Sequence, residues 1–395
     1  MLFLPLDLGG ILAIFLIYGV DVNMQGVLTK GNIDQTILEV ENLSRLSKVY
    51  ISTTDSQSYS NLFNGKAEHL SSKLFSLPGT TLGRLLGSAI FFVIGFVSIT
   101  RRLKEVEVIV TNGTTALQGA VANFLFRKPH ITFLHYFAYD EQFLLKRQFL
   151  PYLFRIVELF LIRYSNCVIA PNEVLQTKAL GHGAKSVQII PNFVEIKRIN
   201  KMDDRGILRK KLGFNDSSVI LFVGRLHPVK NVDLLLRAFE RIDRLREHIL
   251  VIIGDGPEKQ RLVDLANSLN ISKRVFFEGF KAKDAVLEYM KASNVLVLPS
   301  SVEGQPRVVL EAWACELPVV ASRRPGLKTL INDRVDGLLF DLGDEDGLTE
   351  AISVALDRKT AVKIASNAKR KAAQYDVAKV LSDQRNVVMG FLQRN

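Results

Sequence analysis

Residues 294–322 read NVLVLPSSVEGQPRVVLEAWACELPVVAS, and this stretch contains the pattern that decides the fold. An apolar run at 294–300 leads into a polar loop, a helical pattern begins at residue 307, and a second apolar run follows at 318–322. Short apolar runs joined through a helix are typical of parallel strands. The loop also separates two acids, Glu303 and Glu311, which are either solvated side chains near a helix start or parts of a ligand site.

The same alternation extends in both directions and predicts an α/β fold with two doubly wound parallel sheets. Strands are expected at 11–19, 48–53, 106–111, 130–135, 166–171 and 186–191 in the first half, and at 218–224, 248–254, 274–279, 294–300, 318–322 and 337–340 in the second. The charged segment 195–218 separates the halves. We expect a first domain over 1–195, a second over 196–375, and a final helix at 376–395 that packs back on the first domain.

Composition restricts the function classes. The net charge of +11 favours partners that carry phosphate, namely nucleotides, nucleic acid or an anionic membrane. Zinc-knuckle spacing, an RRM-like aromatic strand and a repeated basic helix are all missing from the sequence, so nucleic acid is not an expected partner. Two distant cysteines, Cys167 and Cys315, lie in apolar surroundings, which indicates core residues in a cytoplasmic, reducing compartment.

Two apolar segments could be mistaken for targeting or membrane-spanning elements. The first nineteen residues have no basic region and no clear cleavage site, so their second half is interpreted as a buried strand. The run at 85–99 would be about 22 Å long as a helix, shorter than the roughly 30 Å hydrocarbon core. We therefore expect no spanning segment.

Residues that directly follow strands are the candidates for ligand contact, because parallel sheets bind ligands at the carboxyl ends of their strands. Arg225 and Lys230 follow one strand and precede a helix expected near residue 231, which suits a diphosphate; solvated surface cations are the alternative. Gly256 and Gly279 follow two further strands, where a structural turn explains them equally well.

The order of these motifs over residues 219–340 closely resembles the nucleotide-sugar domain of the family 4 retaining glycosyltransferases, the "glycosyl transferases group 1". The resemblance implies a GT-B fold and a UDP- or GDP-sugar donor, with no essential metal and no covalently bound cofactor. By this resemblance Arg225 and Lys230 bind the diphosphate, Glu311 the ribose hydroxyls and Glu303 the donor sugar. His135, at the end of an expected strand, matches a histidine near that sugar; a structural histidine is the alternative.

The resemblance also assigns the loop after Glu303 to the sugar hydroxyls, through Gly304, Gln305, Arg307 and Val308. The family usually has Gly-Phe-Gly here, whereas this chain has Gly-Gln-Pro, and proline removes one backbone donor. In the amino-terminal loop the chain has single glycines instead of a pair. Of these, Gly31 precedes a helical pattern and is the expected neighbour of the phosphates or the acceptor.

The expected acceptor is a hydroxyl, and a lipid-linked or membrane-resident glycan is the candidate, because the segments 85–104 and 143–164 combine large apolar residues with cations. Both segments could instead be buried helices. An anionic membrane surface at the cytoplasmic face is therefore a possible partner. The alternative functions are an epimerase-like enzyme acting on nucleotide sugars and a non-catalytic nucleotide-sugar or membrane-surface binding protein.

Overall fold

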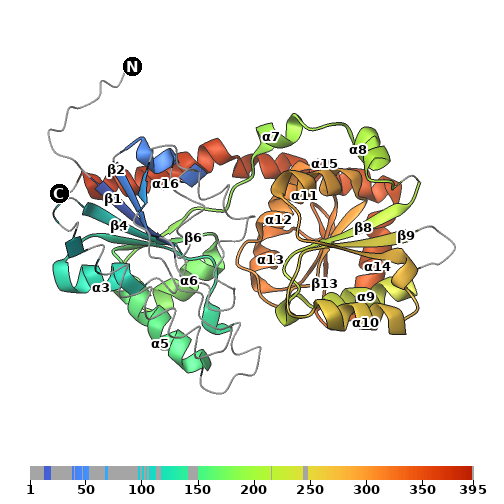
Figure 1. The fold of residues 1–395 in the computed structure, drawn as a ribbon, viewed down its shortest axis with the longest axis horizontal. Coiled ribbons are helices and arrows are strands. Elements are labelled where there is room, and N and C mark those ends of the chain that lie inside the picture. Colours follow the sequence, from blue (N-terminus) through green and yellow to red (C-terminus); the bar gives the residue numbers. More distant parts are fainter. Residues whose placement is uncertain are drawn as a thin grey trace.

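The structure is a computed structural model in which two parallel sheets, each flanked by helices, form two lobes (Figure 1). It describes residues 13–18, 38–39, 41–46, 48–52, 67–69, 97, 100–101, 104, 106–112, 117–140, 150–214, 216–242 and 248–393. The expected position Gly31 and the apolar run at 85–96 lie outside the described residues. Among the described helices, none has the length and apolar character needed to cross a bilayer.

In the described part of the chain, the first sheet has seven parallel strands in the order β3-β2-β1-β4-β5-β6-β7. Its strands are β1 (Ala13–Tyr18), β2 (Lys48–Ser52), β3 (Ala67–His69), β4 (Val106–Asn112), β5 (His130–Phe133), β6 (Cys167–Ala170) and β7 (Val187–Ile189). Its helices include α3 (Leu117–Phe126), α5 (Leu150–Arg163) and α6 (Glu173–Gly181). The strand order reverses between β1 and β4, which marks the ligand-binding crevice of an open sheet.

Among the residues that the structure describes, the second sheet has six parallel strands in the order β10-β9-β8-β11-β12-β13. Its strands are β8 (Ser218–Val223), β9 (His248–Ile253), β10 (Val275–Gly279), β11 (Val295–Leu298), β12 (Val319–Ser322) and β13 (Leu338–Phe340). Its helices are α9 (Val232–Arg241), α10 (Lys259–Ser268), α11 (Lys283–Ala292), α12 (Arg307–Ala314), α13 (Pro325–Leu330), α14 (Glu345–Leu356) and α15 (Arg358–Ala372). Here the order reverses between β8 and β11.

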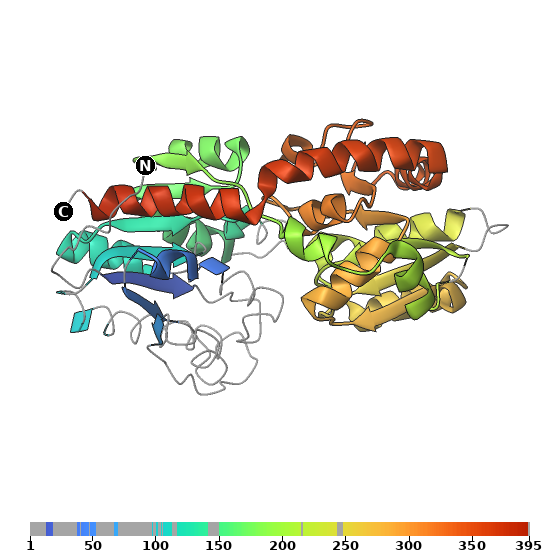
Figure 2. The same ribbon diagram turned by 90° about the horizontal axis from the view of Figure 1, so that it is seen from above.

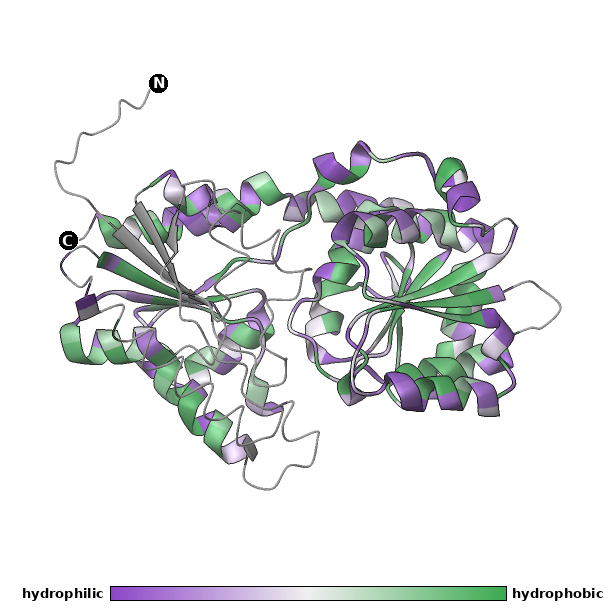
Figure 3. Cartoon of the chain, viewed as in Figure 1, coloured by the Kyte–Doolittle hydropathy of each residue, from purple (hydrophilic) through white to green (hydrophobic). Residues whose placement is uncertain are grey.

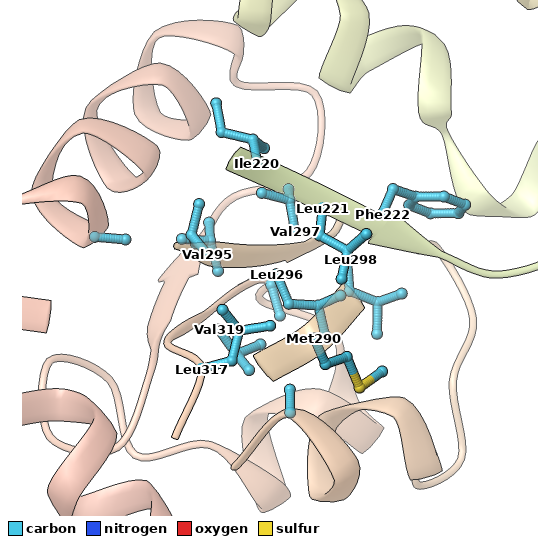
Figure 4. Close-up of a cluster of buried hydrophobic side chains, with 14 of the residues drawn as sticks. Ile220, Leu221, Phe222, Met290, Val295, Leu296, Val297, Leu298, Leu317 and Val319 are labelled. Atoms are coloured by element: carbon cyan, nitrogen blue, oxygen red, sulfur yellow. The ribbon is translucent and has the colours of Figure 1, made fainter. Parts of the chain in front are cut away.

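The core of the second lobe explains why its strands read as continuous apolar runs. Side chains of β8 and β11 interleave with those of neighbouring elements, including Met290 and Val319 (Figure 4). Trp313 of α12 is fully buried in the same cluster. A parallel sheet covered on both faces has no solvated side, so its strands contain few polar residues.

The chain crosses between the lobes twice, and the two crossings are hydrogen bonded to each other. Val194 donates its N–H to Tyr375 O at 2.9 Å, and Val377 donates to Val194 O at 3.1 Å. Between these crossings lie the second sheet and the short helices α7 (Ile196–Asn200) and α8 (Arg205–Lys211). After the second crossing, α16 (Val377–Leu392) runs along the first lobe (Figure 2), where Val380 and Val388 are buried in its core.

All twelve strands predicted from the sequence are present, with bounds that differ by one or two residues at some ends. The short strand β3 was not predicted, because its sequence AEH has no apolar pattern and only its pairing with β2 defines it. Both cysteines are buried and free, as expected for core residues. The domain boundaries drawn from the sequence stay a prediction.

A buried polar cluster lies in the centre of the first lobe around His130. Its ring Nε2 contacts Thr111 Oγ1 at 2.8 Å and Thr132 Oγ1 at 3.2 Å, and its Nδ1 lies 3.3 Å from Ser165 Oγ. Burial lowers the pKa of His130 from its ordinary 6.5 to about 4. The ring is therefore neutral in the folded protein at pH 7.

Because the pKa of His130 is lower in the folded state than in the unfolded state, we expect stability to be lost as the pH falls from 6.5 towards 4. The size of the effect should be about 3 kcal/mol in the free energy of unfolding. Urea denaturation at several pH values measures it, and His130→Asn, which cannot titrate, should reduce the slope. An equal slope in the variant and the wild type would contradict this.

Candidate functional site

Arg225 and Lys230 lie in the loop that follows β8. Gly254 after β9 supports this loop: its φ is +139°, and a Cβ there would lie 1.9 Å from Gly224 O. Gly256 is equally constrained, since its Cβ would lie 2.3 Å from Leu226 O. Both glycines are therefore required where the loops after β8 and β9 meet. Arg225 is partly buried in this arrangement.

Lys230 and Glu303 are brought together across the reversal point of the second sheet. Lys230 Nζ lies 2.5 Å from Glu303 Oε1, and their side chains are 21% and 11% exposed. The loops that carry them are joined by Ser301 N–H, which donates to Val229 O at 2.7 Å, and by Asn231 Nδ2, which donates to Pro299 O at 3.0 Å. A cation and an acid that the resemblance assigns to different parts of a donor thus form one ion pair.

Glu311 occupies the second turn of α12 and is surrounded by charged side chains. Burial raises the pKa of Glu311, while the positive charges of Arg307 and Lys283 act in the opposite direction. Lys283 itself forms an ion pair with Glu195, which precedes α7. Glu311 is only partly covered from solvent, so a ligand hydroxyl could reach its carboxylate.

His135 lies two residues beyond the carboxyl end of β5, where the first lobe meets the second. Burial and the positive charge of Arg307 lower the pKa of His135 to about 4, so its ring is neutral at pH 7. Its Nε2 contacts Asn112 Oδ1, and Asn112 Nδ2 donates to Glu39 Oε2 at 3.4 Å. Because Glu39 is placed to accept, the amide oxygen of Asn112 faces His135, and the histidine proton resides on Nε2.

The loop after Glu303 touches the first lobe. Gly304 is buried, and a Cβ on it would lie 1.8 Å from His135 O. Gln305 is buried too, while Arg307 and Val308, in the first turn of α12, are partly buried. Gly279, at the end of β10, has a φ of +66°, and its backbone oxygen accepts the N–H of Gly254 at 2.8 Å, so it lies beside the loop after β9.

Three residues that contact these groups were not predicted, namely Asn112, Asn172 and Asn192. Asn112 ends β4, and the other two follow β6 and β7 in the repeated dipeptide Pro-Asn. That repetition at strand ends was the signal available in the sequence. No group of three or more His, Cys, Asp or Glu side chains able to hold a metal ion occurs in the part of the chain that the structure describes.

Comparison with known proteins finds family similarity in the second half of the chain. Residues 204–371 match the sequence model of the family "Glycosyl transferases group 1". The chain is 27% identical over 288 residues to UDP-Gal:alpha-D-GlcNAc-diphosphoundecaprenol alpha-1,3-galactosyltransferase of Escherichia coli, covering 70% of this chain and 73% of that protein. It is 31% identical over 192 residues to the lipopolysaccharide core biosynthesis glycosyltransferase LpsE of Rhizobium meliloti (strain 1021), covering 48% of this chain and 54% of that protein.

Solved structures agree in fold over nearly the whole chain. The crystal structure of Anabaena HepE in complex with UDP-glucose aligns with a TM-score of 0.77 at 22% identity, covering 96% of this chain and 99% of HepE. The fold is therefore GT-B, as expected from the sequence. Residues 204–371 are thus similar to the glycosyl transferases group 1 family, within a chain that has the GT-B fold.

Proposed function

We propose that this protein is a retaining glycosyltransferase that moves a hexose from a UDP- or GDP-sugar to a hydroxyl of a lipid-linked or membrane-resident glycan. The observation that carries the proposal is the ion pair between Lys230 and Glu303 at the reversal point of the second sheet. Arg225 lies in the same loop as Lys230, and His135 faces the loop after Glu303 from the other sheet. The bound UDP-glucose of HepE, a protein of the same fold, supports a nucleotide-sugar donor.

In this proposal Arg225 and Lys230 stabilise the departing diphosphate. Breaking the bond between the sugar carbon and the phosphate oxygen leaves negative charge on the diphosphate, and fixed cations lower the barrier to that step. Glu303 holds Lys230 in place before the donor arrives, since their charged groups are in direct contact. Oxygen of the leaving phosphate takes the proton of the acceptor hydroxyl.

Two further side chains hold the rest of the donor. The Glu311 carboxylate accepts hydrogen bonds from the ribose hydroxyls, and loss of its proton is aided by Arg307 and Lys283. His135 is neutral at pH 7, so it contributes a hydrogen-bonding ring and no positive charge near the sugar. The backbone of Gly304, Gln305, Arg307 and Val308 borders the sugar, and Gly256, Gly279 and Gly31 are proposed as further neighbours of the donor.

The acceptor side of the proposal rests on α3 and α5 of the first lobe. Six large apolar side chains on these adjacent helices are exposed, and Figure 3 shows hydrophobic residues along both helices. We define them as the α3–α5 surface: Phe124, Leu125, Phe126, Tyr152, Leu153 and Ile156. The exposed cations Arg127 and Arg155 accompany it, a combination that suits the anionic cytoplasmic face of a membrane.

Arg225→Ala should reduce kcat/KM for sugar transfer by about 100- to 1000-fold, because one charge contact to the leaving group is lost. Its melting temperature should stay within a degree or so of the wild type. The assay is incubation with labelled UDP- and GDP-sugars and a membrane lipid extract, and Arg358→Ala, on an exposed residue of α15, is the matched control. Donor conversion without an acceptor, no turnover by the wild type, or full activity of Arg225→Ala would each contradict the proposal.

Glu311→Gln should raise the melting temperature of the protein at pH 7 in the absence of ligand, because burial makes the charged carboxylate unfavourable there. The same change should remove most of the stabilisation given by UDP or GDP, which bind only the folded state. Thermal unfolding with and without nucleotide measures both effects. Glu316→Gln, on an exposed residue just beyond α12, should alter neither. A lower melting temperature without ligand, or an unchanged nucleotide shift, would count against the assignment.

Ile156→Glu should weaken binding to liposomes that contain anionic lipid, since it places a negative charge on the α3–α5 surface. Val362→Glu is the control, because Val362 lies on α15 of the other lobe and is 65% exposed, compared with 66% for Ile156. Flotation at low salt measures the bound fraction. Wild-type protein that stays at the bottom of the gradient, or equal loss in both variants, would exclude this surface as the membrane contact.

A further inference from the structure

Gln305 forms two hydrogen bonds with a single residue of the other lobe. Its side-chain Oε1 accepts from the backbone N–H of Asn192 at 2.6 Å, and its backbone oxygen accepts from Asn192 Nδ2 at 2.6 Å. Gln305 is only 7% exposed, so water has little access to compete for either hydrogen bond. Gln305 and Asn192 are 113 positions apart in the sequence, and they lie on loops that follow strands of different sheets, β11 and β7.

Asn172 makes a third bond across the same boundary. Its Nδ2 donates to Gly304 O at 2.8 Å, while its Oδ1 accepts the N–H of Leu175 at 3.0 Å and so caps α6. Both ends of the Asn172 amide are thus used, one within the first lobe and one towards the second. The absent Cβ of Gly304 allows this contact, because the carbonyl of His135 occupies that space.

The local sequence makes both sides of this boundary rigid. Asn172 and Asn192 each follow a proline just beyond the end of a strand, β6 and β7 respectively, and proline fixes its own backbone angle φ at that point. On the opposite side, Pro306 restricts Gln305 to extended backbone conformations and so directs its carbonyl oxygen. The Gln-Pro pair, which departs from the usual Gly-Phe-Gly, is therefore accounted for by contacts with the first lobe.

We propose that Gln305, Asn172 and Asn192 are positioning residues that hold the loop 303–307 against the first lobe and thereby set the donor sugar opposite the acceptor. They act through the loop and do not take part in the chemical step. The catalytic part of this inference rests on the proposed function, whereas the control of lobe separation does not.

Two variants remove one bond each with little other change. Asn172→Ser keeps a good cap for α6, since serine also accepts a hydrogen bond there, but serine is too short to reach Gly304. Gln305→Leu keeps the shape of the side chain and removes its acceptor oxygen. Asn367→Ser is the control: Asn367 Nδ2 donates to Val335 O at 2.9 Å, so that variant loses a bond of the same type within one lobe.

The first readout is the distance between spin labels placed at Leu180 and Val362, two exposed positions in different lobes. The native cysteines are buried and should label poorly. We expect a narrow distribution for the wild type and for Asn367→Ser, and a broader, longer one for Asn172→Ser and Gln305→Leu. Distributions equal to the wild type in both of these folded variants would overturn the proposal, whether or not the protein transfers sugar.

The second readout is steady-state transfer together with nucleotide binding. Misplacement of the loop should lower kcat by about 10- to 100-fold in both variants, while the Kd for UDP or GDP stays within about twofold of the wild type. An unchanged kcat alongside a wider lobe separation would overturn the positioning role. If the wild type transfers no sugar, the proposed function fails and the distance measurement alone decides whether these residues hold the lobes together.

Discussion

The close approach of Gly304 to the carbonyl of His135 is the contact on which the arrangement of the two lobes depends. A side chain at position 304 would overlap the backbone of the first lobe, so only glycine lets the loop after β11 reach it. Polar groups around this contact are hydrogen bonded across the boundary: Asn172 Nδ2 donates to Gly304 O, and Asn192 donates to Gln305. The crossing strands at Val194 and Tyr375 then fix the lobes at a second place.

Charge is organised around the same loop. Arg307, at the start of α12, influences both His135 in the first lobe and Glu311 in the second. It helps keep the histidine neutral and favours ionisation of the acid. Lys230 and Glu303 compensate each other a short distance away. A site assembled from such groups can accept an anionic ligand without leaving buried charges unpaired before it binds.

Much of the fold could be predicted from the sequence, because buried parallel strands are short apolar runs and their boundaries coincide with glycine, proline and polar residues. The order of strands within each sheet was not encoded in that pattern. The pairing of Lys230 with Glu303 depends on β8 lying beside β11, which the sequence suggests only through family resemblance. The contact between Asn192 and Gln305 was harder still to predict, since it depends on how two separate sheets are placed relative to each other. The repeated Pro-Asn dipeptide marks Asn172 and Asn192 in the sequence, but it does not indicate that they bond to Gly304 and Gln305.

A crystal structure with a bound nucleotide-diphosphate sugar would show whether the donor binds at the carboxyl ends of β8 and β11, beside the loop that joins the lobes. We expect the diphosphate within hydrogen-bonding distance of Arg225 and Lys230, the ribose at Glu311, and Gln305 still bonded to Asn192. A nucleotide bound elsewhere, or a diphosphate that contacts neither cation, would contradict this expectation.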